Sequence, residues 1–126
     1  MADQISQAWL AFCRRGRISI GHQRRSVESC LGPDGVVRGY YSDLVLDPTL
    51  GDRDSMYPSH DHMTFPHEDR TMVVDARLFN DMKSHLDETE FWLVIEHFYA
   101  VGRAKGRIPN RSPERLPAGW APRRSF

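Results

Sequence analysis

The stretch from Asp87 to Gly102 constrains the fold most, because it carries the markers of a complete helix. Asp87 can accept hydrogen bonds from the first free amides, and Glu90 follows at the position that bonds back in a capping box. Apolar residues then recur at intervals of three and four, at Phe91, Val94, Ile95, Phe98 and Val101. Because Trp92 and Tyr99 widen this surface, we expect the helix to be covered on more than one side and to end at Gly102.

An amino-terminal segment also shows helical spacing. It follows Asp3, a suitable helix cap, and carries Trp9 and Phe12 on one face. Gly16 is placed to end this helix. We expect its Trp9 and Phe12 face to pack against the helix that runs from Phe91 to Val101.

A third helical segment is predicted over residues 72–86. Its apolar residues recur every four positions, at Val74, Leu78, Met82 and Leu86. The chain breaks only briefly, at Leu86 and Asp87, before the next helix begins. The two helices should therefore form an antiparallel or angled pair in the carboxyl half.

Residues 17–46 favour short strands. Ile18 and Ile20 alternate with polar neighbours, and residues 36–46 are rich in Val, Tyr and Leu. The sequence Gly32-Pro33-Asp34-Gly35 is a strong turn signal, since proline presets its own dihedral angle and glycine accepts positive ones. We expect a small β hairpin here, followed by a long loop over residues 47–70 that shows no regular period.

These elements predict an α+β fold that is mainly helical, with an amino-terminal helix, a carboxyl-half helix pair and a small β hairpin. At 126 residues the chain is one domain by size. We place the globular domain at residues 1–102, with the loop 47–70 inside it. Residues 103–126 hold four prolines and seven basic residues against one acid, so we expect a basic proline-rich tail.

The composition predicts a cytoplasmic protein with reduced thiols. Cys13 and Cys30 are the only cysteines, too few for a disulfide framework. No apolar run approaches the length needed to cross a bilayer, so we expect no membrane contact. The formal net charge is zero, yet residues 34–90 hold thirteen acids against five bases while the tail is basic. Such polarity suits contact with nucleic acid or acidic protein.

The histidines of the long loop are the candidate metal ligands. His60, His62 and His67 lie close together in sequence with carboxylates nearby, and could ligate zinc or another divalent ion. A chain that gathers them with a carboxylate would be a metal-dependent enzyme. The stretch lacks the regular spacing of established metal sites, and the chain has neither a Gly-x-Ser-x-Gly elbow nor a phosphate-cradling glycine loop. We therefore expect no enzymatic activity, metal or cofactor.

Three segments together resemble the bacteriophage late-gene antitermination proteins of the Q type. They are the Trp-containing helix that ends in basic residues (9–17), Val74-Asp75 followed by a helical spacer, and the aromatic run from His97 to Gly102. The resemblance implies a small phage-encoded regulatory protein in the host cytoplasm, which binds the host RNA polymerase and promoter-proximal DNA so that transcription passes terminators. This chain departs from the family after Gly102, where a basic segment rich in glycine and proline replaces the usual helix-turn-helix.

Without a recognition helix, the predicted contacts are electrostatic. Arg103, Lys105, Arg107 and Arg111 form the expected basic contact set, which would meet phosphate or acidic protein without reading bases. Trp120 could fold the tail back onto the body or anchor a partner, and we include it in the contact set as the anchor. A small phage-encoded inhibitor that blocks a host defence complex or another assembly stays open as an alternative, because it would use the same charged surfaces.

Overall fold

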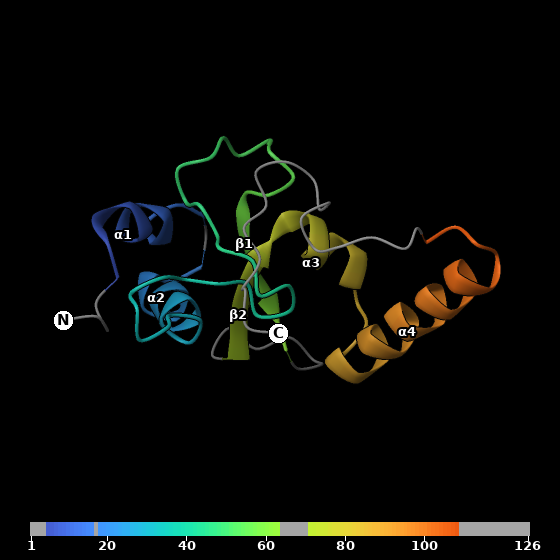
Figure 1. Ribbon diagram of the computed structural model, residues 1–126. Helices are drawn as coiled ribbons and strands as arrows, with labels where there is room; N and C mark the ends of the chain where they lie inside the picture. Colours follow the sequence, from blue (N-terminus) through green and yellow to red (C-terminus); the bar gives the residue numbers. More distant parts are fainter. Residues whose placement is uncertain (1–4, 17, 64–70, 109–126) are drawn as a thin grey trace.

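The computed structural model describes residues 5–16, 18–63 and 71–108. These residues form four helices and one two-stranded antiparallel sheet (Figure 1), which confirms the predicted α+β class. In chain order the elements are α1 (Gln7–Cys13), α2 (Ile20–Glu28), β1 (Pro58–His62), β2 (Met72–Ala76), α3 (Arg77–Lys83) and α4 (Glu88–Ala104).

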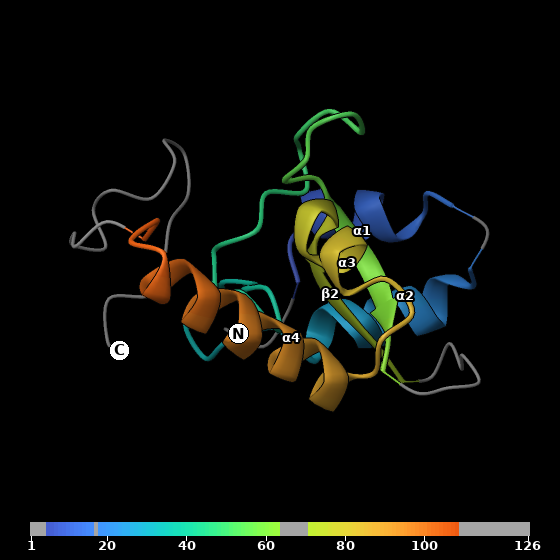
Figure 2. The same cartoon turned by 90° about the vertical axis from the view of Figure 1, so that its right-hand side faces the viewer.

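The hairpin of β1 and β2 organises the rest of the fold. Its register pairs Pro58 with Ala76 and His62 with Met72. At the other edge of β2, the amide of Tyr40 donates to the carbonyl of Val74 at 3.0 Å. Helices α1 and α2 lie on one side of the hairpin, and α3 and α4 lie on the other (Figures 1 and 2).

The main hydrophobic cluster fills the side covered by α1 and α2. Trp9 and Phe12 of α1 meet edge to face at a centroid distance of 5.2 Å, and they pack with Val27 of α2 and Val74 of β2. Phe91 of α4 belongs to a separate cluster with Tyr41 and Val73. The expectation that α1 packs against α4 is therefore wrong, because the hairpin lies between their two clusters.

The start of α1 also differs in detail from the prediction. The hydroxyl of Ser6 caps the helix by accepting from the amide of Trp9 at 3.3 Å. Asp3, the predicted cap, lies outside the described residues. The predicted end is confirmed, because Gly16 takes a positive φ of 88° just after the helix.

Residues 20–28 form α2, where strands were predicted. Ser19 caps this helix by accepting from the amide of His22 at 3.2 Å. Its buried residues are Gln23, Ser26 and Val27. Because two of these three are polar, the buried face of α2 has no hydrophobic period that could reveal a helix.

The predicted turn at Gly32 to Gly35 is present, but it does not join two regular strands. The amide of Gly35 donates to the carbonyl of Gly32 at 3.0 Å, and Gly35 has a positive φ of 78°. The flanking residues form isolated bridges, from Leu31 to Val37 and from Arg38 to Val45. The small hairpin of the predicted fold class therefore lies later in the chain.

That hairpin occupies residues predicted as loop and helix. β1 falls within the predicted loop 47–70, and its sequence Pro-Ser-His-Asp-His is too polar to suggest a strand. β2 falls within the predicted helix 72–86, and all five of its residues are buried. Val73 and Val74 belong to the two different clusters, because successive strand residues face opposite sides. A strand covered on both sides loses the alternation that would identify it.

The carboxyl-half helix pair is confirmed, with a shorter first member. α3 begins only at Arg77, directly after β2, and the predicted break around Leu86 and Asp87 separates it from α4. The side-chain Nδ2 of Asn80 connects α3 to β1 by donating to the Ser59 carbonyl at 2.9 Å. Across residues 5–16, 18–63 and 71–108, no helix is long and apolar enough to span a bilayer.

Candidate functional site

The start of α4 is as predicted, and it fixes the direction of the helix. Asp87 accepts from the amide of Glu90 at 2.8 Å, and the Glu90 carboxylate accepts from the amide of Asp87 at 3.0 Å. These two bonds complete the capping box. Leu86 packs against the cluster that contains Phe91. The first turn of α4 is thus held firmly beside the hairpin.

The prediction that α4 is covered on more than one side is wrong. Of its residues only Phe91 is buried, whereas the exposed fractions are 44% for Trp92, 59% for Leu93, 66% for Phe98 and 57% for Tyr99. Figures 1 and 2 show the reason: α4 begins beside the hairpin, and its carboxyl end projects away from it. We call residues 88–95 the inner half of α4 and residues 96–104 its outer half.

The far end of α4 lies beyond Gly102, its predicted last residue. The helix continues to Ala104, and Gly106 takes the left-handed conformation with a φ of 65°. The amide of Arg107 then donates to the Gly102 carbonyl at 2.8 Å. A Cβ at position 102 would lie 2.8 Å from the side chain of Ile108, so glycine here allows Ile108 to pack against the helix.

Three members of the predicted basic contact set lie together at this end. Arg103, Lys105 and Arg107 are all exposed, and we call them the tip cations. The Arg103 guanidinium lies 6.0 Å from the centroid of the Tyr99 ring, within the range of a cation–π contact. Arg111 and Trp120, the other predicted contact residues, lie outside the described residues.

A buried polar network lies near the inner end of α4. Lys83 Nζ is 3.1 Å from Asp61 Oδ2, and the Tyr41 hydroxyl donates to the same oxygen at 2.6 Å. Burial, and then the hydrogen bond to Asp61, raises the pKa of Tyr41 far above its usual range. The exposed fractions are only 8% for Tyr41, 9% for Asp61 and 2% for Lys83. We interpret the network as a structural tie between the segment before β1, β1 itself and α3.

A second buried carboxylate holds the turn around Tyr41. Asp75, fully buried in β2, accepts from the amides of Tyr41 at 2.8 Å and Ser42 at 2.9 Å, and from the Ser42 hydroxyl at 2.8 Å. A Cβ on Gly39 would clash with Asp75 Oδ1, so only glycine fits there. Sequence reasoning missed both networks, because the side chains that bond in them come from segments 20 to 34 residues apart in the chain.

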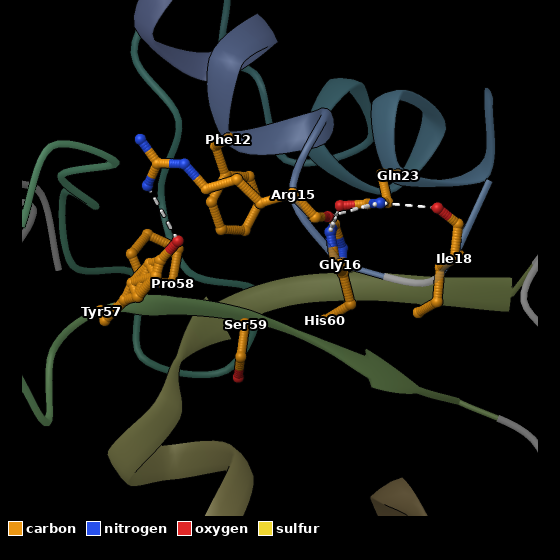
Figure 3. Close-up of a pocket in the computed structure, with 9 residues that line it drawn as sticks. All are labelled: Phe12, Arg15, Gly16, Ile18, Gln23, Tyr57, Pro58, Ser59 and His60. Atoms are coloured by element: carbon orange, nitrogen blue, oxygen red, sulfur yellow. Dashed lines mark hydrogen bonds between the residues drawn. The ribbon is translucent and has the colours of Figure 1, made fainter. Parts of the chain in front are cut away.

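A cavity of about 300 Å³ lies on the opposite side of the hairpin, between the end of α1 and β1 (Figure 3). Phe12, Tyr57 and Pro58 supply apolar lining. Arg15 reaches across Phe12 toward Tyr57, and its Nη1 donates to the Tyr57 hydroxyl at 3.1 Å. His60 completes the lining on the β1 side.

His60 is held as a neutral imidazole. The side-chain Nε2 of Gln23 donates to the carbonyls of Arg15 at 3.0 Å and Ile18 at 2.8 Å, which leaves its Oε1 facing His60 Nε2 at 3.2 Å. We therefore assign the ring proton to Nε2, and Nδ1 accepts from the Ser26 hydroxyl at 2.7 Å. Burial, with a smaller effect of His62, lowers the pKa of His60 to about 4. Through these two hydrogen bonds, His60 connects β1 to α2.

This arrangement bears on the metal hypothesis. Both ring nitrogens of His60 already have protein partners, and His62 lies two residues along the same strand. His67, the third predicted ligand, lies outside the described residues. Within residues 5–16, 18–63 and 71–108 no group of three or more His, Cys, Asp or Glu side chains is placed to hold a metal ion.

The two cysteines are free and poorly suited to act as nucleophiles. Cys13 is buried and Cys30 partly buried. Burial raises the pKa of both thiols above the usual value, so the reactive thiolate is disfavoured. Cys30 instead donates weakly to the carbonyl of Val74 at 3.7 Å.

Comparison with protein-family models, curated proteins and solved structures finds no match to this chain. The resemblance to the Q-type antitermination proteins therefore stays a hypothesis that depends on three segments. Trp9 lies in α1, Val74 and Asp75 lie in β2, and the run from His97 to Gly102 lies in the outer half of α4.

Proposed function

We propose that the protein acts without catalysis, by binding an acidic surface of the host transcription machinery through the tip cations. One observation supports this most: Arg103, Lys105 and Arg107 are all exposed at the end of a helix that projects from the hairpin. A projecting cationic end can approach a phosphate backbone or an acidic protein surface with little obstruction. The proposed contact extends along the chain to Arg111 and Trp120.

The choice of partner comes from the resemblance to the Q-type proteins. It favours RNA polymerase together with promoter-proximal DNA, and the resulting effect would be passage through terminators. The tip cations would neutralise phosphates or carboxylates and so position the protein on the complex. They would not select a base sequence, because base selection needs side chains that reach the base edges in a groove.

A non-catalytic function also agrees with the placement of the ionisable groups. Tyr41, Asp61 and Lys83 are at most 9% exposed, so a substrate has little access to them. His60, the histidine beside the cavity, donates through one ring nitrogen and accepts through the other. These groups are engaged in holding the hairpin to its neighbours.

The exposed aromatic residues favour a second candidate function. Phe98 and Tyr99, at 66% and 57% exposure, suit the surface of a protein better than a phosphate backbone. An inhibitor that binds and blocks a host defence complex or another assembly would use them. Binding that responds little to salt would favour this candidate, because apolar contacts are less sensitive to screening.

The test is binding of the full chain to purified bacterial RNA polymerase and to promoter-proximal duplex DNA over a series of salt concentrations. The triple variant Arg103→Gln, Lys105→Gln, Arg107→Gln should weaken binding at least about tenfold at low salt. For DNA it should reduce the slope of log K against log salt by about one for each phosphate that is no longer neutralised.

A matched control separates a local contact from net charge. The triple variant Arg14→Gln, Arg25→Gln, Arg53→Gln also removes three exposed positive charges, but from other parts of the described chain. It should retain most of the binding. Equally weakened binding in the two triple variants would mean that net charge alone drives the interaction. An unchanged tip variant would show that the tip cations are not the contact.

A further inference from the structure

We infer that the apolar stripe of α4 is the contact surface of an antiparallel homodimer, in which the cationic end of each helix faces the acidic start of the other. The stripe consists of the side chains on the face of α4 that begins with Phe91 and continues through Ile95 to Phe98, with Tyr99 at its flank. This inference goes beyond the proposed function, because its partner is a second copy of this chain.

The apolar stripe is continuous along the helix, but only its first part is buried against the rest of the protein. Phe91 and Phe98 are seven residues apart, close to two turns, so they share one face. Phe91 is 4% exposed and Phe98 is 66% exposed. Ile95, between them, packs partly against the cluster of Tyr41 and Phe91. The apolar face of α4 thus extends beyond the part of the helix that packs on the hydrophobic core, and the Phe98 ring on it is exposed to solvent.

Ile108 limits how far along the stripe a partner can reach. Ile108 packs against the helix at Gly102, where a Cβ would lie 2.8 Å from its side chain. The open part therefore lies between Ile95 and Gly102, around Phe98 and Tyr99. A contact centred on this region can be shared by two copies of α4 that cross there, each covering the exposed aromatic residues of the other.

The order of charges along α4 identifies a second copy as the occupant. The first turn carries Glu88 and Glu90, and the last turn carries Arg103, followed by Lys105 and Arg107. A two-fold pairing with antiparallel helices places each cationic end near the acidic start of the other helix, and it repeats the same contact twice. A parallel pairing would set cations beside cations and acids beside acids. One α4 surface is therefore complementary to another only in the antiparallel arrangement.

Pairing has a consequence for the function proposed above. The tip cations that would meet phosphate or an acidic protein face carboxylates in the homodimer, so pairing and partner binding compete for them. The two proposals can fail separately, because self-association is measured on the isolated protein, without polymerase or DNA.

The experiment is sedimentation equilibrium of the full chain over a wide range of protein concentrations. The wild type should show a reversible monomer–dimer equilibrium. The double variant Phe98→Ser, Tyr99→Ser should weaken dimer formation at least about tenfold. At a protein concentration low enough to keep both proteins monomeric, its urea unfolding curve should stay close to that of the wild type, because both side chains are largely exposed in the monomer.

Two further variants test the face and the direction of the pairing. Leu93→Ser removes an apolar side chain that is 59% exposed, yet on the opposite side of the helix from the stripe, so it should leave the dimer intact. Reversal of the tip by Arg103→Glu, Lys105→Glu, Arg107→Glu should weaken an antiparallel dimer and leave a parallel one no weaker. A wild type that stays monomeric, a dimer indifferent to removal of Phe98 and Tyr99, or a dimer indifferent to the tip reversal would overturn the inference.

Discussion

The inner and outer halves of α4 follow the same sequence pattern in different surroundings. Phe91 lies in a cluster with Tyr41 and Val73, whereas Phe98, two turns later on the same face, is 66% exposed. The hydrophobic period therefore shows which face of a helix is apolar, but not how far along the helix that face is covered. The inner half attaches α4 to the second hydrophobic cluster through Phe91, and the outer half is largely exposed.

Replacement of the two phenylalanines should give the largest difference between the halves. Phe91→Ala should lower the free energy of unfolding by about 3–5 kcal/mol, because it removes a buried ring and leaves a cavity. Phe98→Ala should change it by less than about 0.5 kcal/mol, because its ring is already mostly in water. Urea unfolding at a protein concentration low enough to avoid self-association measures both. Similar decreases would mean that the outer half is covered in the monomer.

The second prediction concerns the lysines of the two regions. Lys83→Ala should lower the free energy of unfolding by about 3 kcal/mol, because it leaves the Asp61 carboxylate buried without its cation. Lys105→Ala, at the exposed tip, is the matched control and should have almost no effect on stability. Thermal and urea unfolding of the two variants give the comparison. A mild effect of Lys83→Ala would indicate that water reaches Asp61.

The sequence predicts the parts of this fold that depend on local signals. The capping box of Asp87 and Glu90, the end of α1 at Gly16 and the turn at Gly32 to Gly35 each involve residues a few positions apart, and all are found. The exposed position of three predicted contact residues, Arg103, Lys105 and Arg107, also agrees with their charge.

The remaining features depend on contacts between distant segments, which local signals do not contain. The spacing of Val74 and Leu78 suits a single helix, but Val74 lies in β2, which is covered on both sides and pairs with β1, and only Leu78 lies in α3. β1 can be polar because Asp61 meets Tyr41 and Lys83, and His60 meets Ser26. No residue near these positions in sequence indicates such partners. The exposure of Phe98 likewise depends on how far along α4 the rest of the protein covers the helix.

The third prediction concerns the uncharged hydrogen bonds by which His60 connects β1 to α2, in contrast to the ion pair of Lys83 and Asp61 on the other side of the hairpin. The pKa of His60 is about 4 in the folded protein and near 6.5 in an unfolded chain. Between these values the unfolded state binds more protons, so the free energy of unfolding falls as the pH is lowered. From pH 7 to pH 5 the decrease attributable to His60 should be roughly 2 kcal/mol.

Urea unfolding at several pH values measures this decrease as a difference between proteins. His60→Gln should be less stable than the wild type at pH 7, and its stability should fall less on acidification. His97→Gln alters an exposed histidine of α4 and should keep the pH dependence of the wild type. If the stabilities of His60→Gln and the wild type fall in parallel, the imidazole already accepts a proton in the folded state and the assigned tie is wrong.

The smallest expected effect concerns the cap that joins α4 to the hairpin. Asp87→Ala removes the acceptor of the Glu90 amide and should lower the free energy of unfolding by about 1 kcal/mol. Because the cap lies at the inner end, amide hydrogen exchange should speed up in the first turn, around Glu88 to Phe91, more than around Tyr99. Asp81→Ala, which removes an exposed carboxylate from α3, provides the control for the change in charge. Faster exchange along the whole of α4 would mean that its two halves unfold as one unit, and that the contrast between them concerns burial and not local stability.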